Sequence, residues 1–301
     1  MECFNTVTVL SKLYTSFFRF DENFTILRKV IAFTQNNRTI VKNIPITLAF
    51  IAITLLIFSQ PIIAQGYKLK KVVIDAGHGG KDPGTHGKYL NEKDLVLKIA
   101  LKVGGYIEKY IPDVEVTYIR KTDVYIHPKI RAEMANDLEA DVFISIHANA
   151  LPTKTSVYGT ETYIMGTQNT GRNFEVAKRE NSVILLEENY EEKYEGFNPN
   201  SPESYIMFSL TQSAFHENSL LLANYIEKQF KERAGRRSLG VKQSSLWVMW
   251  ATAMPSVLVE IGYLTNPKEE NELKNEQTQD YIASGIYRAF KEYKNQLESI
   301  N

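Results

Sequence analysis

Short apolar runs alternate with stretches of helical periodicity along this chain, and the alternation predicts an α/β fold. The run from 71 to 74 reads as a buried strand, and the segment from 92 to 110 repeats apolar residues at helical spacing behind a favourable N-cap residue, Asn91. Further elements follow in the same rhythm: a strand at 114–119, a helix at 128–138 and a strand at 142–146. This order is typical of a largely parallel sheet that is covered by helices.

The alternation of predicted strands and helices ends after a further predicted strand at 159–165. Residues 166–204 are rich in turn formers and include an acidic run, so we interpret them as an insertion or lid. Asn266-Pro267-Lys268-Glu269 has the residues of a well-formed helix start. The remaining pattern predicts a helix at 212–233, strands at 246–249 and 257–259, and a last helix at 280–297.

The first 64 residues read as a leader. No residue from 43 to 67 is charged, and the core at 44–58 is almost wholly apolar. Basic residues precede this core and Ile62-Ile63-Ala64 offers a cleavage site, as in a secretory signal peptide. The alternative is an uncleaved membrane anchor, because the stretch is long enough to span a bilayer. The expected location is therefore outside the cytoplasm, in the periplasm or cell envelope, with membrane attachment only if the leader is retained.

Composition excludes several classes of function. The 35 Lys and Arg balance the 35 Asp and Glu, so nothing indicates a nucleic-acid-binding surface. Cys3 is the only cysteine and lies in the leader. The mature chain therefore has no disulfide, no thiol nucleophile and no metal site that uses cysteine.

Four polar residues stand at positions that suggest chemistry. His78 and His147 each follow a predicted strand, Glu260 ends another, and Glu92 begins the first helix. Ligands bind beyond the carboxyl ends of parallel strands, so these side chains are expected to meet. Two imidazoles and one carboxylate leave a fourth position open on a tetrahedral Zn²⁺, and a second glutamate could take a proton from water.

Each of these residues also has a structural interpretation. A histidine at a strand end is often part of hydrogen-bonded packing, Glu92 suits the first turn of a helix, and Glu260 could belong to a buried ion pair. The metal site is favoured because three strands would otherwise place costly polar groups at one edge by coincidence. We interpret His86 as a solvated loop residue and His127 and His216 as structural.

Four blocks occur in order along the chain: IDAGHGGKDPG, NEKDLVLKIA, SIHANA and PSVLVEIGYLTNPKEE. A supporting pattern lies between the second and third blocks and consists of Arg120, Asp123, Arg131 and Asn136. In these motifs, from about 71 to 293, the chain resembles the zinc-dependent N-acetylmuramoyl-L-alanine amidases of the cell-separation type.

The resemblance implies a mixed, largely parallel six-stranded sheet flanked by helices on both faces, within a catalytic domain at 68–298. It implies that His78, Glu92 and His147 bind one Zn²⁺ and that Glu260 is the catalytic acid/base. The implied reaction is hydrolysis of the amide between N-acetylmuramic acid and L-alanine in peptidoglycan, in cell wall turnover and daughter-cell separation. Trp250 is a departure, because many relatives have an arginine there.

Relatives that act in cell division carry a helix at the place of the insertion, which covers the zinc until an activator protein displaces it. The resemblance suggests that the acidic run with Glu187, Glu188 and Glu191 supplies a carboxylate to the fourth zinc position; the alternative is a solvated acidic helix. Two other functions stay open at this point: a zinc peptidase or deacetylase on another wall substrate, and a non-catalytic wall-binding module.

Overall fold

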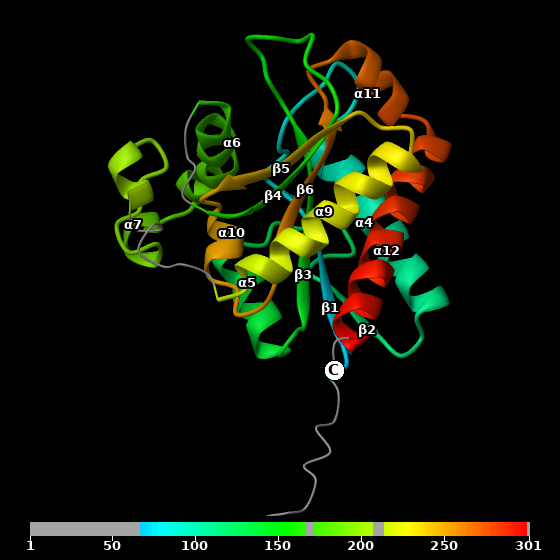
Figure 1. The fold of residues 1–301 in the computed structure, drawn as a ribbon. Coiled ribbons are helices and arrows are strands. Elements are labelled where there is room, and N and C mark those ends of the chain that lie inside the picture. Colours follow the sequence, from blue (N-terminus) through cyan, green and yellow to red (C-terminus); the bar gives the residue numbers. More distant parts are fainter. Residues whose placement is uncertain (1–66, 167–170, 207–213, 300–301) are drawn as a thin grey trace, which may run out of the picture. The chain divides into compact units, whose positions relative to one another are not determined.

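A mixed sheet of six strands forms the centre of the computed structural model, which describes residues 67–166, 171–206 and 214–299 (Figure 1). The predicted leader at 1–64 and its apolar core lie outside the described residues. The strands are β1 (Lys71–Ala76), β2 (Glu115–Tyr118), β3 (Val142–Asn149), β4 (Thr160–Met165), β5 (Ser238–Ser244) and β6 (Ser256–Tyr263).

The strands lie in the order β2-β1-β3-β6-β4-β5. Strand β1 pairs in parallel with β2 and with β3, and β3 pairs in parallel with β6. Strand β4 is antiparallel to β6, and β5 is parallel to β4. The expected mixed, largely parallel sheet is therefore confirmed, and the carboxyl ends of β1, β3 and β6 lie at the same edge.

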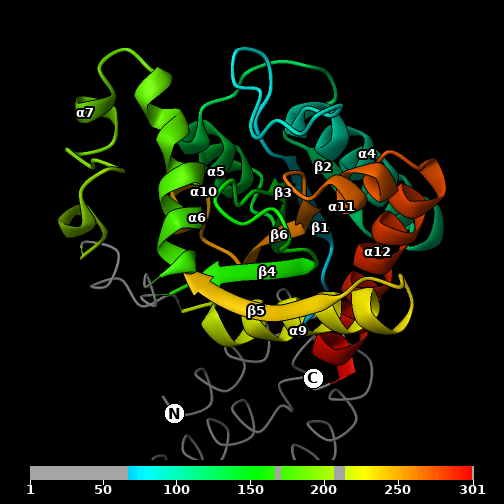
Figure 2. The ribbon, with the colours of Figure 1, turned by 90° about the horizontal axis from the view of Figure 1, so that it is seen from above.

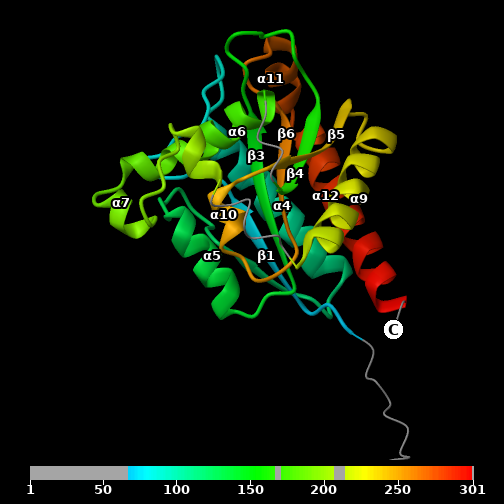
Figure 3. The ribbon, with the colours of Figure 1, turned by 60° about the vertical axis from the view of Figure 1, so that its left-hand side comes forward.

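Helices cover both faces of this sheet (Figures 1 and 3). One face packs against α4 (Glu92–Tyr110), α9 (His216–Glu232) and α12 (Glu276–Ser299), and the other lies against α5 (Pro128–Asp137), α6 (Arg172–Asn181) and α10 (Trp247–Trp250). The short helix α11 (Pro267–Leu273) follows β6. None of the described helices is both long and apolar enough to cross a membrane.

The two faces differ in chemistry because side chains alternate along a strand. In β3, Ile144 and Ile146 belong to the core under α4, α9 and α12, whereas Phe143 belongs to the core on the other face. His147 has the same parity as Phe143, and it is in register with Glu260 on β6. Both residues therefore lie on the face that α5, α6 and α10 cover.

Part of the insertion is described and contains more structure than its turn-rich sequence indicates. After α6 come the 3-10 turn η2 (Ser182–Leu186), the single-turn helix α7 (Tyr190–Lys193) and the 3-10 turn η3 (Pro202–Tyr205). Seen from above, α6 lies over the edge of the sheet and α7 lies further out (Figure 2).

Several element predictions need correction. The strand predicted at 246–249 is the short helix α10, because a brief apolar run has no periodicity that separates a strand from a buried helix. Strand β5 was not predicted, since it lies at the edge of the sheet, is mostly half-buried and has only Leu239 and Val241 as apolar residues.

The predicted caps also differ in outcome. Asn266 caps α11, because its side-chain oxygen accepts hydrogen bonds from the backbone N–H groups of Lys268 and Glu269. Helix α4 begins at Glu92 as predicted, but the side chain of Asn91 makes no capping bond and its Oδ1 instead lies 2.9 Å from His86 Nδ1.

Candidate metal centre

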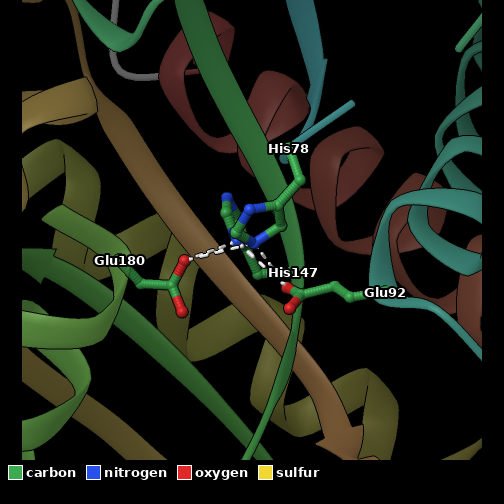
Figure 4. A group of neighbouring side chains, drawn as sticks. All are labelled: His78, Glu92, His147 and Glu180. Carbon is green, nitrogen blue, oxygen red and sulfur yellow. Dashed lines mark ion pairs between the residues drawn. The ribbon is translucent and has the colours of Figure 1, made fainter. Parts of the chain in front are cut away.

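Four side chains from distant parts of the chain meet at the carboxyl edge of the sheet. His78 follows β1, His147 lies near the end of β3, Glu92 begins α4 and Glu180 lies near the end of α6. One ligand atom from each lies within 4.8 Å of all the others. Glu92 and Glu180 approach the two imidazoles from opposite sides (Figure 4).

The atoms that face one another are two nitrogens and two carboxylate oxygens. Glu92 Oε1 lies 3.1 Å from His78 Nε2 and 3.2 Å from His147 Nδ1. Glu180 Oε2 lies 3.4 Å from His78 Nε2 and 2.9 Å from His147 Nδ1. The structure thus brings together the three predicted zinc ligands and adds a fourth residue.

Surrounding hydrogen bonds fix the orientation of two of these side chains, His78 and Glu92. His78 Nδ1 lies 2.7 Å from Asp82 Oδ2, which leaves Nε2 directed at the cluster. The Glu92 carboxylate accepts a bond from the N–H of Thr85 at Oε2 and one from the N–H of Ala148 at Oε1. The protein itself thus holds both side chains in place.

The residues fit a metal ion. His78 Nε2, His147 Nδ1 and Glu180 Oε2 are buried and find no hydrogen-bond partner among the described residues. Buried polar atoms without partners are costly, and a cation between them would satisfy all three. Imidazole nitrogen and carboxylate oxygen are also the donor types that bind zinc.

The histidines and glutamates of the cluster strongly shift one another's pKa values. Burial disfavours the charged forms, but the Glu92 carboxylate raises the pKa of His78 well above its ordinary value, and Glu180 raises that of His147 to about 9. Conversely, burial opposes ionisation of Glu92, yet His78 lowers its pKa to about 2. Without a metal ion, protons on the imidazoles balance the two carboxylates.

Glu260 lies beside the cluster and has different surroundings. Its side chain is fully buried, and burial together with the negative charge of Glu180 raises its pKa well above the ordinary value. Arg179 Nη2 donates to its Oε1 at 3.2 Å, while its Oε2 has no hydrogen-bond partner in the described part of the chain. A carboxyl group of raised pKa with one free oxygen suits proton transfer.

Helix α6 is held over the site by contacts at both of its ends. Arg172 at its start pairs with the buried Glu161, which is in antiparallel register with Glu260 across β4 and β6. Arg179, two turns later, pairs with Glu260, and the next residue is Glu180. Asn181 ends the helix and accepts a bond from the N–H of Trp247 on α10.

The glutamates predicted to occlude the zinc lie elsewhere. Glu188 and Glu191 are exposed. Glu187 is buried, but its Oε1 accepts bonds from the hydroxyls of Tyr125 and Tyr194, and its Oε2 lies 2.5 Å from His127 Nδ1. The structure therefore does not bring the acidic run to the cluster.

Sequence reasoning missed Glu180. It stands in a polar stretch between Arg179 and Asn181, outside any recognisable metal-ligand spacing. The available signal was Lys178 and Arg179 followed by Asn181, because basic residues in a last turn with Asn behind them are typical of a helix end.

Comparison with known proteins decides the family. Residues 72–292 match the family described as N-acetylmuramoyl-L-alanine amidase, and this range contains all four cluster residues and Glu260. The chain belongs to this amidase family. The amidase is therefore a hydrolase that acts on the amide bond of peptidoglycan.

Individual relatives agree with this assignment. The amidase is 31% identical over 230 residues to AmiC of Escherichia coli, a match that covers 74% of this chain and 52% of AmiC, about half of that relative's length. The catalytic domain of CwlV from Bacillus (Paenibacillus) polymyxa is 32% identical, with a TM-score of 0.56 over 75% of this chain and 98% of that domain.

A third relative has been solved with a partner. The CwlD amidase of Clostridioides difficile, in complex with the GerS lipoprotein, is 25% identical to this chain. The TM-score is 0.55, and the match covers 74% of this chain and 98% of CwlD.

Proposed function

We propose that this amidase uses one Zn²⁺, bound by His78, Glu92 and His147, to cut the bond between N-acetylmuramic acid and L-alanine in the peptidoglycan stem peptide. The observation that carries the proposal is the convergence of two imidazoles and a carboxylate at one buried point, where three polar atoms make no hydrogen bond among the described residues and face only one another and Glu92. Glu260 adjoins this point on the neighbouring strand.

A zinc ion in this position would polarise the scissile carbonyl and lower the pKa of water to roughly 7. Glu260 then accepts the proton of the attacking water and passes it to the leaving nitrogen of L-alanine. Its carboxyl group is buried beside the cluster and its Oε2 makes no hydrogen bond among the described residues, so it is placed to take up a proton and release it again. Asp82 keeps the ring of His78 in the tautomer that presents Nε2.

The proposed setting is the cell envelope. The leader at 1–64 would direct the chain out of the cytoplasm, and the substrate would be the peptidoglycan that is remodelled in wall turnover and daughter-cell separation.

Incubation of the full-length chain with purified sacculi, with and without a zinc chelator, tests this function. We expect release of stem peptides with a free L-alanine amino terminus, and loss of this release when zinc is chelated. Fragments cut within the peptide or at an N-acetyl group would instead indicate a peptidase or a deacetylase. Chelator-resistant cleavage would remove zinc from the mechanism.

We further propose that α6 holds the enzyme in an inactive state. Catalytic zinc sites keep a position open for water or substrate, whereas structural sites have four protein ligands. Glu180 faces the same point as the three ligands and would close that position, and Arg179 would neutralise the carboxylate of Glu260. Activity would then require a partner protein that binds the insertion and draws α6 away.

A further inference from the structure

The loop that carries His78 has a backbone conformation that needs support. His78 has a φ of 59°, in the left-handed region that residues with side chains seldom adopt. The loop leaves β1 at Ala76, where the strand ends. The carbonyl groups of residues 76, 77 and 78 therefore need partners outside the sheet.

Arg131 on α5 donates hydrogen bonds to two of these three carbonyl groups. Its guanidinium is buried, donating from Nη1 to the carbonyl of Ala76 at 2.8 Å and from Nη2 to that of His78 at 2.6 Å. The same Nη1 donates to Asp75 Oδ1 at 2.7 Å, and Ser145 Oγ donates to the other oxygen of Asp75. Burial opposes ionisation of Asp75, but Arg131 lowers its pKa, so the pair is charged.

Arg120 completes the set. It is also buried, and it donates from Nε to the carbonyl of Ala76 at 2.9 Å and from Nη2 to that of Gly77 at 2.7 Å. The two arginines thus bind three successive carbonyl groups. Lysine could not reproduce this, because its ammonium lacks the planar fork of donors.

We infer that Arg131 and Arg120 are positioning residues for the metal centre, which lock the backbone of residues 76–78 so that His78 Nε2 is aimed at the ion. Neither arginine side chain is a ligand, and Asp82 orients only the imidazole ring. The inference rests on the proposed zinc function. Partners of this kind around a metal ligand typically contribute about tenfold to a hundredfold in metal affinity.

The test compares zinc dissociation constants of full-length Arg131→Lys and Arg120→Lys with that of the original chain, by competition with a chromophoric chelator. Arg236→Lys is the matched control, because Arg236 is also buried and is ion-paired with Glu269 and Glu272 of α11. We expect zinc binding about tenfold to a hundredfold weaker in the first two variants. The control should lose thermal stability and keep its zinc affinity.

The outcomes distinguish the positioning role of the two arginines from the proposed zinc function. Unchanged zinc affinity in a folded Arg131→Lys and Arg120→Lys would overturn the positioning role while leaving the zinc enzyme intact. Failure of both variants to fold would also overturn it, since the arginines would then be needed for the fold itself. An original chain that binds no zinc would end the proposed function and this inference together.

Discussion

Among single side chains, Glu260 has the surroundings most specific to catalysis. It is fully buried, its Oε2 has no hydrogen-bond partner among the described residues, and burial raises its pKa. We expect Glu260→Gln to bind zinc as before and to hydrolyse peptidoglycan about 10² to 10⁴ times more slowly, because the amide cannot carry a proton. Zinc content and the rate of sacculus hydrolysis measure the two effects.

The control for this substitution is Glu227→Gln. Glu227 is also buried, but it lies on α9 at the opposite face, where hydroxyls of Thr160, Thr162 and Ser238 donate to it. This variant should retain full activity. Wild-type-like hydrolysis by Glu260→Gln would take the acid/base role away from that residue.

How far single residues could be predicted depends on what surrounds them in the sequence. The sequence predicts His78, His147 and Glu260 at the ends of apolar strands. In the structure His147 and Glu260 lie within the second halves of β3 and β6, and because β1, β3 and β6 run parallel all three residues come to the same region of the sheet. Glu180 lies in the predicted insertion. Its approach to the histidines depends on tertiary contacts of α6, which no motif or spacing in the sequence indicates.

Among the elements, α6 combines a candidate blocking ligand with two anchoring arginines. Loss of the carboxylate of Glu180 removes charge-assisted contacts of about 1.5–3 kcal/mol, and every 1.4 kcal/mol corresponds to roughly a factor of ten. We therefore expect Glu180→Gln to raise basal hydrolysis of sacculi at least about tenfold. The rate without any added partner protein is the quantity to measure.

Glu188→Gln is the control, since Glu188 belongs to the same insertion and is exposed. It should leave the basal rate unchanged. A basal rate in Glu180→Gln no higher than that of the original chain would contradict occlusion by α6, although zinc would still bind to the other three residues.

Helices and strands were predictable where the apolar periodicity was strong and where the element does not depend on contacts with residues distant in sequence. Helix α4 begins and ends where the apolar repeat predicts. Strand β5 was missed because its two apolar residues, Leu239 and Val241, are too few to give a periodic signal. Helix α6 is short and mostly polar, and it is held by ion pairs to β4 and β6 rather than by a continuous apolar stripe.

For the described domain as a whole, the candidate metal centre joins parts of the chain that are far apart in sequence. Its four candidate ligands come from the loop after β1, from α4, from β3 and from α6. The sequence motifs predicted the first three of these segments, and the order of the strands, with β3 between β1 and β6, explains why they meet. A ligand that binds only the folded state stabilises it by about 2.7 kcal/mol at a hundred times its dissociation constant.

This stabilisation should depend on pH in a defined direction. Without zinc, Glu180 raises the pKa of His147 to about 9, so pairing of the protonated imidazole stabilises the folded state below pH 6.5 and is lost as the pH rises through 9. Zinc needs the neutral imidazole and must displace this proton. The rise in melting temperature caused by zinc should therefore be larger near pH 9 than near pH 6.

Thermal unfolding with and without zinc, measured across this pH range, checks the linkage. His78→Ala serves as the control, because a variant without one ligand should lose the zinc-dependent shift at every pH and thereby exclude zinc bound elsewhere. The coupling is a property of the whole domain: protons at one buried centre and the folding of four distant segments change together. A zinc effect that is constant with pH, or larger in acid, would contradict the competition between zinc and protons at His147.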